Sequence, residues 1–167
     1  MNRKCGAIFD WDGVIINSAP QHETSWERLA KECGKALPEN HFKRGFGMKN
    51  ESIIPDLLGW TSAPVEVRLL SLRKEAIYRE VVREQGMTAL PGVESWLQLM
   101  REAKIPCVIA SSTHRENITT TLEVLGLGDF FRGHYFRGRC EAGQARSRGF
   151  SLGGATDWRR AAGRHRF

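Results

Sequence analysis

A short apolar run that ends in two aspartates constrains this 167-residue chain more than any other feature. Residues 5–10 are expected to form a buried strand, which would end at the sheet edge where α/β folds place their active sites. Because side chains alternate along an extended chain, Asp10 and Asp12 are predicted to point the same way. Gly13 then permits a sharp turn of the backbone. The pattern predicts two carboxylates that share a metal and a substrate.

Two structural alternatives compete with a catalytic role for these aspartates. Many strands end at Asp and Gly for structural reasons alone, but that explanation accounts for neither the doubled aspartate nor the glycine. An EF-hand calcium loop needs a third oxygen ligand before the glycine and a helix upstream. The paired carboxylates therefore favour a catalytic site.

The composition is typical of one modest globular domain, or of a core with a small insertion. The hydrophobic content is 41%, and no apolar run approaches the length of a membrane span. The cysteines show no paired spacing and are expected to be free thiols in a reducing compartment: Cys5, Cys33, Cys107 and Cys140. We therefore expect a cytoplasmic protein with no membrane partner.

The net charge of +6 comes from the last part of the chain. Residues 1–131 hold 16 Lys or Arg against 17 Asp or Glu, whereas residues 132–167 hold nine Arg against Glu141 and Asp157. The first 131 residues therefore lack the electrostatic footprint of a nucleic-acid-binding domain. Nucleic acid is not an expected partner.

Helical periodicity follows the first strand. A helix is expected to begin near Ser18 and Pro20 and to end at Gly34, and a longer helix is expected to begin at Pro64. Between them lies a looser stretch and a short helix.

Alternating elements then return. Residues 105–110 are predicted to form a second strand, and a capping box that begins at Thr113 is predicted to open a helix that stops at Gly126. The order predicts an α/β fold, with a Rossmann-like parallel sheet and a small α-helical cap inserted after the first strand.

Two aspartates at a strand end suit phosphoryl transfer by a covalent route. One carboxylate attacks phosphorus, and the other protonates the leaving group and later activates water. Since a phosphate dianion repels a bare carboxylate, a divalent cation is needed, and carboxylate, carbonyl and water ligands favour Mg²⁺. Asp10 and Asp12 are thus predicted as catalytic residues and as metal ligands.

The end of the second strand carries a candidate phosphate site. Ser111 and Ser112 stand just before a predicted helix N-terminus, where hydroxyl and backbone N–H groups can cradle a phosphate. The alternative is plain capping of that helix by Ser112 or Thr113.

Two further residues have an uncertain role. Lys74 lies in the middle of an apolar helical stripe, where a lysine usually extends its ammonium to the rim. The alternative is that this face closes over the active site and Lys74 contacts substrate. His22, on the first turns of the cap, would by itself more often be a surface histidine than a catalytic group.

Together these motifs resemble the haloacid dehalogenase superfamily, in the branch of β-phosphoglucomutase-like phosphatases with a small helical cap. The resemblance covers roughly residues 5–131 and implies that Asp10 is the nucleophile, Asp12 the general acid/base and Ser111 a phosphoryl ligand. It implies an α/β core formed by residues 1–16 and 88–131, and a cap formed by residues 17–87.

The resemblance also concerns the cap. His22 matches a histidine near the acid/base in the mutase branch, and Lys74 matches a cap lysine that approaches the active site. The mutase has an arginine for the distal phosphate in a cap loop where this chain has Lys49 and Asn50. Lys49 is therefore a candidate substrate contact, and a phosphatase is favoured over a sugar-phosphate mutase.

Residues 132–167 depart from the family as a basic, Arg- and Gly-rich tail in which no strand or helix is expected. They contain no lysine for the third motif and no acidic pair for the fourth. One hypothesis is an extra base near the codons for Phe131 and Arg132, because the codons of residues 143–148, read one base later, can encode Gly-Lys-Pro. The alternative is a natural tail that binds RNA or acidic surfaces.

The predicted function is Mg²⁺-dependent hydrolysis of a small phosphate monoester, from a phosphorylated metabolite, through an aspartyl-phosphate on Asp10. This chain is expected to be impaired, because losing such electrostatic groups typically costs ~10²–10³ in rate each. A sugar-phosphate mutase and a non-catalytic truncated paralogue are the alternatives. The substrate and the oligomeric state stay open.

Overall fold

The computed structural model describes residues 5–136 and 139–142. Its sheet has four strands in the order β1-β2-β3-β4. They are β1 (Ala7–Phe9), β2 (Cys107–Ser111), β3 (Phe131–Phe136) and β4 (Arg139–Ala142). The first three strands are parallel, and β4 is antiparallel to β3. The predicted α/β fold with a parallel sheet is confirmed.

Two helices and a short 3-10 turn complete what we call the sheet region: α5 (Val93–Glu102), α6 (Arg115–Leu125) and η2 (Gly128–Phe130). Their apolar side chains form one core with the inner residues of β1 and β2, and Trp11 lies at its centre with no exposed surface. Other members of this core are Ile15, Leu97, Ile109, Ile118 and Leu122. Burial of this set stabilises the sheet, at roughly 1.5–3 kcal/mol for each fully buried large side chain.

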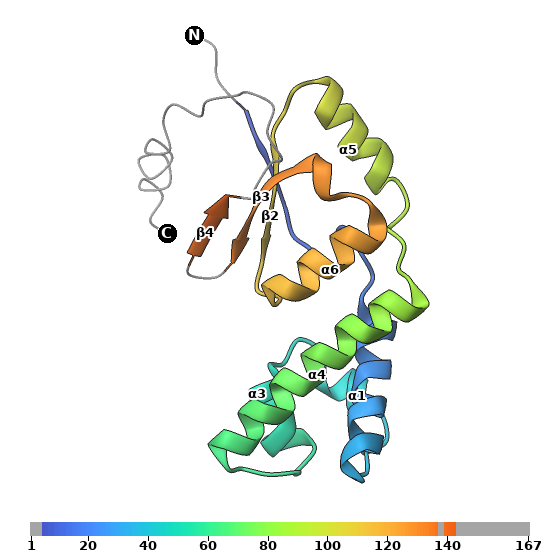
Figure 1. Cartoon of the computed structure of the whole chain (residues 1–167), viewed down its shortest axis with the longest axis vertical. Coiled ribbons are helices and arrows are strands. Elements are labelled where there is room, and N and C mark those ends of the chain that lie inside the picture. The colour runs from blue at the N-terminus through green and yellow to red at the C-terminus, as the bar shows by residue number, and fades with distance from the viewer. Residues whose placement is uncertain (1–4, 137–138, 143–167) are drawn as a thin grey trace.

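The elements between β1 and α5 are helices joined by loops, and we call them the helical region. It consists of α1 (Ala19–Cys33), α2 (His41–Gly45), α3 (Asn50–Ser52), the π-helical turn η1 (Ile53–Leu57) and α4 (Pro64–Gln85). It has a separate core that includes Trp26, Leu29, Ile54 and Ile77. Figure 1 shows the helical region at one end of the molecule and the sheet region at the other, with α6 lying between the sheet and α4.

Three helix boundaries lie at the glycine and proline residues that the sequence predicted. Gly34 and Gly126 end α1 and α6 in left-handed conformations, with φ of 62° and 67°, which glycine adopts without a Cβ clash. Pro64 is the first residue of α4, where its missing N–H has no helical partner to lose. These three boundaries are confirmed.

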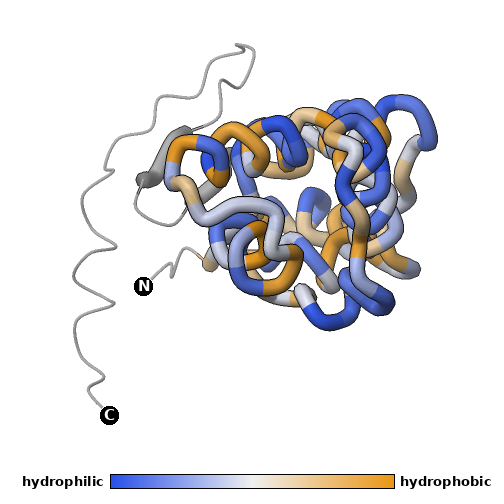
Figure 2. The backbone as a smooth tube through the Cα atoms, turned by 90° about the horizontal axis from the view of Figure 1, so that it is seen from below, coloured by the Kyte–Doolittle hydropathy of each residue, from blue (hydrophilic) through white to orange (hydrophobic). Residues whose placement is uncertain are grey.

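The elements are amphipathic rather than uniformly apolar, and Figure 2 shows hydrophobic and hydrophilic stretches alternating along the backbone. None of the helices in the described part of the chain combines the length and apolarity that crossing a membrane requires.

The expectation of no strand after Phe131 is wrong for the described residues. β3 begins at Phe131 and pairs with β2, and β4 continues the sheet. The physical reason is that the edge of β2 offers unpaired backbone groups, and the aromatic residues Phe131, Tyr135 and Phe136 favour extended chain. The rest of the predicted tail, including residues 143–148 on which the frame hypothesis depends, lies outside the described residues.

Candidate active site

The two aspartates follow β1 in a tight turn. Trp11, between them, is buried in the sheet-region core, and Asp10 and Asp12 are both exposed. The Trp11 N–H donates to Oδ1 of Asp10 at 2.7 Å. Gly13 has φ of 77°, and its N–H donates to the Ile16 carbonyl at 2.8 Å. The buried indole therefore directs its two neighbours outward, and the glycine turns the chain back.

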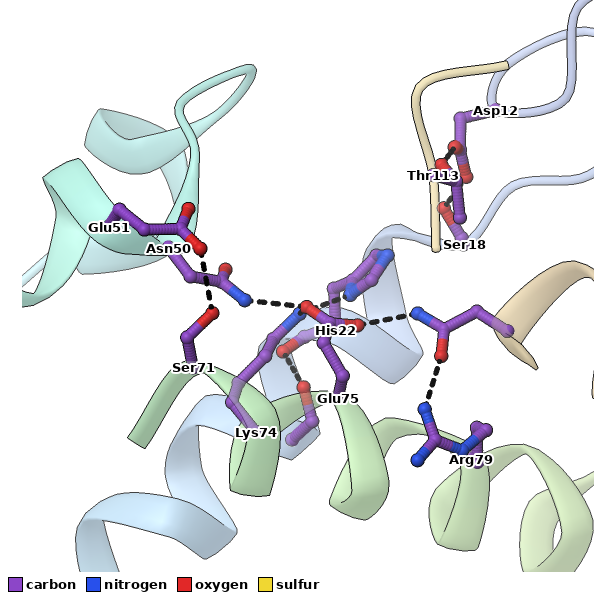
Figure 3. Close-up of polar contacts among 12 residues, drawn as sticks. Asp12, Ser18, His22, Asn50, Glu51, Ser71, Lys74, Glu75, Arg79 and Thr113 are labelled. Atoms are coloured by element: carbon purple, nitrogen blue, oxygen red, sulfur yellow. Dashed lines mark hydrogen bonds and ion pairs between the residues drawn. The ribbon is translucent and has the colours of Figure 1, made fainter. Parts of the chain in front are cut away.

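Asp12 is held by hydroxyls from two other segments. The Ser18 hydroxyl donates to Oδ1 of Asp12, and the Thr113 hydroxyl donates to Oδ2 at 2.6 Å. Figure 3 shows these three side chains as one cluster, which we call the Asp12 cluster. Contacts from both sides orient the carboxylate, and they join the start of the helical region to the loop after β2.

The prediction that Thr113 opens a capping box is wrong. His114 is the N-cap residue of α6, and neither it nor Ser18, the N-cap residue of α1, caps its helix through its side chain. The Thr113 and Ser18 hydroxyls donate to Asp12 instead. A hydrogen bond to a charged carboxylate is roughly twice as strong as a neutral one, which explains the preference.

The two predicted phosphate ligands differ in their surroundings. Ser111 is the last residue of β2, as predicted, and its Oγ accepts the Thr113 N–H at 3.1 Å. A hydroxyl that accepts in this way still has its own hydrogen to donate. Ser112 is exposed and lines the cleft described next.

A cleft of about 620 Å³ separates the helical region from the ends of the sheet strands. Five of the predicted site residues line it: Asp12, His22, Lys49, Lys74 and Ser112. Asp10 and Ser111 are not among the residues that line it. The structure thus brings the residues predicted in the helical region to the same cleft as Asp12.

Lys74 does not extend its ammonium to the rim, so that alternative is wrong. The side chain is 3% exposed. Its Nζ lies 2.6 Å from Nδ1 of His22 and 3.1 Å from Oε1 of Glu75. The ring centroids of Trp26 and Tyr78 lie 5.5 Å and 5.7 Å from Nζ. Burial lowers the pKa of Lys74, and the Glu75 carboxylate opposes that change.

His22 is half-buried against this cluster rather than a surface histidine. Its ring stacks on Tyr78 with centroids 4.1 Å apart. Burial, together with the charge on Lys74, lowers the pKa of His22 to about 3, so the imidazole is neutral near pH 7. Because an ammonium can only donate, Nδ1 accepts from Lys74 and the ring proton is assigned to Nε2.

Glu75 is the most connected residue that the sequence analysis missed. Its Oε1 accepts from Nδ2 of Asn50 at 2.6 Å, and its Oε2 accepts from Nδ2 of Asn117. These contacts and the charge on Lys74 hold the pKa of Glu75 at about 2 despite burial. The signal available in the sequence was its place beside Lys74, because a buried lysine requires a counter-charge. Nothing in the sequence pointed to Asn117.

The loop that resembles the mutase phosphate site lies at the same cleft. Lys49 is exposed as the N-cap residue of α3. Asn50, the next residue, lines the cleft but donates to Glu75. The Asn50 amide group therefore donates to a carboxylate of the chain itself, Glu75.

Asp10 and Asp12 supply a partial set of ligands for Mg²⁺. Among the described side chains, no group of three or more His, Cys, Asp or Glu residues could hold a metal ion. Mg²⁺ commonly keeps several waters and is held by one or two carboxylates with substrate phosphate oxygens. Two exposed carboxylates separated by a single residue fit that kind of site.

Comparisons with known proteins agree with this arrangement. The model of the haloacid dehalogenase-like hydrolase family matches residues 6–150, past Phe131, where the resemblance was expected to end. A chloroplastic 5-amino-6-(5-phospho-D-ribitylamino)uracil phosphatase from Arabidopsis thaliana is 36% identical over 129 residues, which is 75% of this chain and 34% of the relative. A phosphorylated carbohydrates phosphatase from Thermotoga maritima is 25% identical over 74% of this chain and 57% of its own length.

A crystal structure of β-phosphoglucomutase from Clostridium difficile has the same fold, with a TM-score of 0.62 and 25% identity over 83% of this chain and 64% of that one. The chain spans only 34% and 57% of the two relatives named above. The family model nevertheless covers most of the chain, including both aspartates and the whole helical region. The chain belongs to the haloacid dehalogenase-like hydrolase family.

Proposed function

We propose that this protein is a Mg²⁺-dependent phosphatase that hydrolyses a small phosphate monoester through an aspartyl-phosphate on Asp10. The observation that carries the proposal is the Asp12 carboxylate, oriented at a cleft by Ser18 and Thr113. It stands two residues from a second exposed carboxylate. Acid/base and nucleophilic work need two such groups with separate roles.

In the proposed reaction, an oxygen of Asp10 attacks phosphorus and the bond from phosphorus to the leaving oxygen breaks. Asp12, protonated by solvent before this step, gives that proton to the leaving oxygen. Asp12 then takes a proton from water, which attacks the phosphorus of the aspartyl-phosphate and regenerates the Asp10 carboxylate. Ser111 and Ser112 are proposed to donate hydrogen bonds to the phosphoryl oxygens, supported by their place at the end of β2.

Mg²⁺, when bound, neutralises the repulsion between the phosphate dianion and the carboxylates. Asp10 and Asp12 are proposed to hold it, with water and phosphate oxygens as its other ligands. The hard oxygen donors at this turn support the assignment.

The helical region, within residues 17–87, is proposed to act as a cap on a core formed by residues 1–16 and 88–131. The cleft between the two regions supports this assignment. A cap would exclude bulk water from the reacting phosphate, at the cleft that His22, Lys74 and Asp12 line together. Lys49, at the exposed side of the cleft, is proposed as a substrate contact.

A hydrolase is favoured over a sugar-phosphate mutase. Asn50 takes the place where the mutase branch has an arginine for the distal phosphate, and its amide is bound to Glu75. A carboxylate at that end of the cleft repels a second phosphate. The relatives named above act on a ribityl phosphate and on phosphorylated carbohydrates, so a monophosphate with a hydroxylated carbon chain is the first substrate class to test.

The test is release of inorganic phosphate from an aryl phosphate and from 5-amino-6-(5-phospho-D-ribitylamino)uracil, with Mg²⁺ and with a chelator. Asp10→Asn should abolish turnover while the protein stays folded, and the exposed Asp56→Asn serves as the matched control. Turnover that survives Asp10→Asn would exclude the aspartyl-phosphate route. A requirement for a sugar bisphosphate would identify the mutase instead.

We further propose that turnover by this chain is slow, because residues 132–167 contain no lysine to neutralise the phosphate. Resequencing the gene through the codons for residues 128–167 tests the frame hypothesis. A next frame without the lysine motif and a later acidic pair would exclude it. Deletion of residues 132–167 tests the alternative of a nucleic-acid-binding tail.

A cytoplasmic location is proposed from the free thiols of Cys5, Cys33 and Cys107. Cell fractionation tests it.

A further inference from the structure

Glu75 stands where the helical region meets the sheet region. It lies on α4, is 5% exposed, and lines the cleft. One carboxylate oxygen contacts Lys74 and Asn50 within the helical region, and the other contacts Asn117 on α6 of the sheet region. Figure 3 shows Glu75 at the centre of these contacts. One side chain therefore takes part in two otherwise separate sets of contacts.

The first set leads to the cleft. Glu75 accepts from Lys74, which in turn donates to Nδ1 of His22 at 2.6 Å. The distances require Lys74 to sit between a carboxylate and a ring nitrogen, with the remaining ring N–H of His22 left as a donor. Loss of the negative charge at Glu75 would leave a buried ammonium without a counter-charge. The orientation of His22 therefore depends on Glu75 through Lys74.

The second set joins the two regions. Nδ2 of Asn117 donates to Oε2 of Glu75, while Oδ1 of Asn117 accepts from Nη1 of Arg79 at 3.0 Å. The amide cannot be reversed, because reversal would set its donor against Arg79 and its acceptor against the carboxylate. One turn further along α4, Arg83 donates to the Thr120 hydroxyl at 3.1 Å. Polar contacts of fixed polarity therefore hold α4 against α6.

We propose, on the basis of the proposed function, that Glu75 is a positioning residue for this reaction. One of its oxygens holds Lys74 against His22 at the cleft that Asp12 also lines, and the other anchors α4 on Asn117. The placement of the His22 ring and the docking of the helical region on the sheet region are thereby coupled through a single carboxylate. Glu75 itself does not touch the reacting atoms.

The test exchanges the donor and the acceptor in the hydrogen bond between Asn117 and Glu75. Glu75→Gln places an amide donor against the Asn117 donor, and Asn117→Asp places two carboxylates against each other. The double variant restores a donor–acceptor pair, since the introduced glutamine amide can donate to the introduced aspartate and Arg79 still has an acceptor. It also keeps the net charge of the cluster. Glu80→Gln, on the same helix and in contact with the exposed Arg73, is the matched control.

Each variant is measured in two ways. The first is kcat and KM for an aryl phosphate with Mg²⁺. The second is the ¹⁵N shifts of the His22 ring, which report its tautomer and do not depend on turnover. We expect kcat to fall on the order of 10- to 100-fold in each single variant, as misplacement of supporting groups does elsewhere. The double variant should recover most of that loss, and Glu80→Gln should match the wild type.

In Glu75→Gln we also expect the ¹⁵N shifts of His22 to lose the single-tautomer pattern. Unchanged kcat and unchanged ¹⁵N shifts in Glu75→Gln would overturn the proposal. The proposal would also be overturned if the fold-loss in kcat of the double variant equals the product of the two single fold-losses. The two side chains would then contribute independently rather than through their contact. If Glu75→Gln does not fold, Asn117→Asp decides, since it breaks the contact with Glu75 while leaving Lys74 and its counter-charge in place.

The two proposals fail in different ways. If the wild type hydrolyses no phosphate monoester, the proposed function fails, while the ¹⁵N shifts of His22 still show whether Glu75 sets the ring. If the wild type is active and Glu75→Gln equals it in both measurements, only the positioning role fails.

Discussion

The outer and inner faces of α4 carry the same kind of ion pair in opposite surroundings. On the outer face, Arg73 contacts Glu32 at 2.7 Å and Glu80 at 2.8 Å, and all three side chains are 43–45% exposed. On the inner face, Lys74 contacts Glu75 at 3.1 Å, with side chains 3% and 7% exposed. Adjacent cations in the sequence thus lie on opposite faces of one helix.

Their pKa values move in opposite directions. Hydrogen bonds to Glu32 and Glu80 raise the pKa of Arg73, whereas burial lowers the pKa of Lys74. Exposed pairs are worth about 0–1 kcal/mol, while removing one partner of a buried pair costs about 3–5 kcal/mol. The contact distance therefore does not predict which ion pair matters more for stability. The free energy lost when one partner is removed depends on how far the remaining charge is desolvated.

Lys74→Met should have the largest effect. It leaves the buried Glu75 carboxylate without its cation, so we expect the free energy of unfolding to fall by about 3–5 kcal/mol, as measured by denaturant titration at pH 7. Adding Glu75→Gln to this variant should recover part of the loss. If Lys74→Met lowers the free energy of unfolding no more than Arg73→Met does, burial of the inner ion pair has no measurable effect on stability.

The second-largest effect is expected from lowering the pH, which should destabilise the protein through His22 and Glu75 at the inner face of α4. The pKa of His22 is lowered from 6.5 to about 3, and the pKa of Glu75 from 4.5 to about 2. At these two groups the unfolded chain therefore binds more protons than the folded one between pH 6.5 and 2. Their contribution to stability is full above this window and is lost as the pH falls through it. The His22 contribution has a slope of at most about 1.4 kcal/mol per pH unit.

The measurement is the free energy of unfolding at several pH values in the wild type and in His22→Gln. The variant should flatten the curve between pH 6.5 and 4.5, while the Glu75 contribution below pH 4.5 persists. Parallel curves for the two proteins would contradict burial of a neutral histidine.

Thr113→Val extends the comparison to the Asp12 cluster, in which the carboxylate itself is exposed. It removes the donor to Oδ2 of Asp12 with little change in shape, so we expect a stability loss of about 1 kcal/mol. Under the proposed function, kcat should fall by on the order of tenfold, since the carboxylate is less well oriented. Thr113→Ser keeps the hydroxyl and should retain most activity. Equal activity of the Val and Ser variants would count against this role of the hydroxyl.

Arg73→Ala should have the smallest effect. Both of its ion pairs are exposed, so we expect a loss of less than about 1 kcal/mol that shrinks further in high salt. Thermal unfolding at low and high ionic strength checks this. A loss as large as that in Lys74→Met would remove the distinction between the two faces.

Local physics was sufficient to predict much of the architecture. The run before Asp10 formed the first strand, but not the buried one expected, because β1 lies at the edge of the sheet and Ile8 is 73% exposed. Gly34, Pro64 and Gly126 set helix boundaries as expected. Glycine and proline act on the backbone at their own position, so their effect can be predicted without the rest of the fold. The same holds for the two exposed aspartates on either side of a buried tryptophan.

Tertiary structure decided which partner each polar group found. Ser18 and Thr113 are good helix-start residues, but the fold brings both to Asp12, which is 101 residues from Thr113. Their hydroxyls donate to the charged carboxylate because that hydrogen bond is stronger than one to a neutral group. Lys74 stayed buried because Glu75, His22 and two aromatic rings surround it. β3 formed because the edge of β2 was available to pair with it. Thr113, His22 and the edge of β2 each come from a segment far away in the sequence, so local propensity could not reveal these contacts.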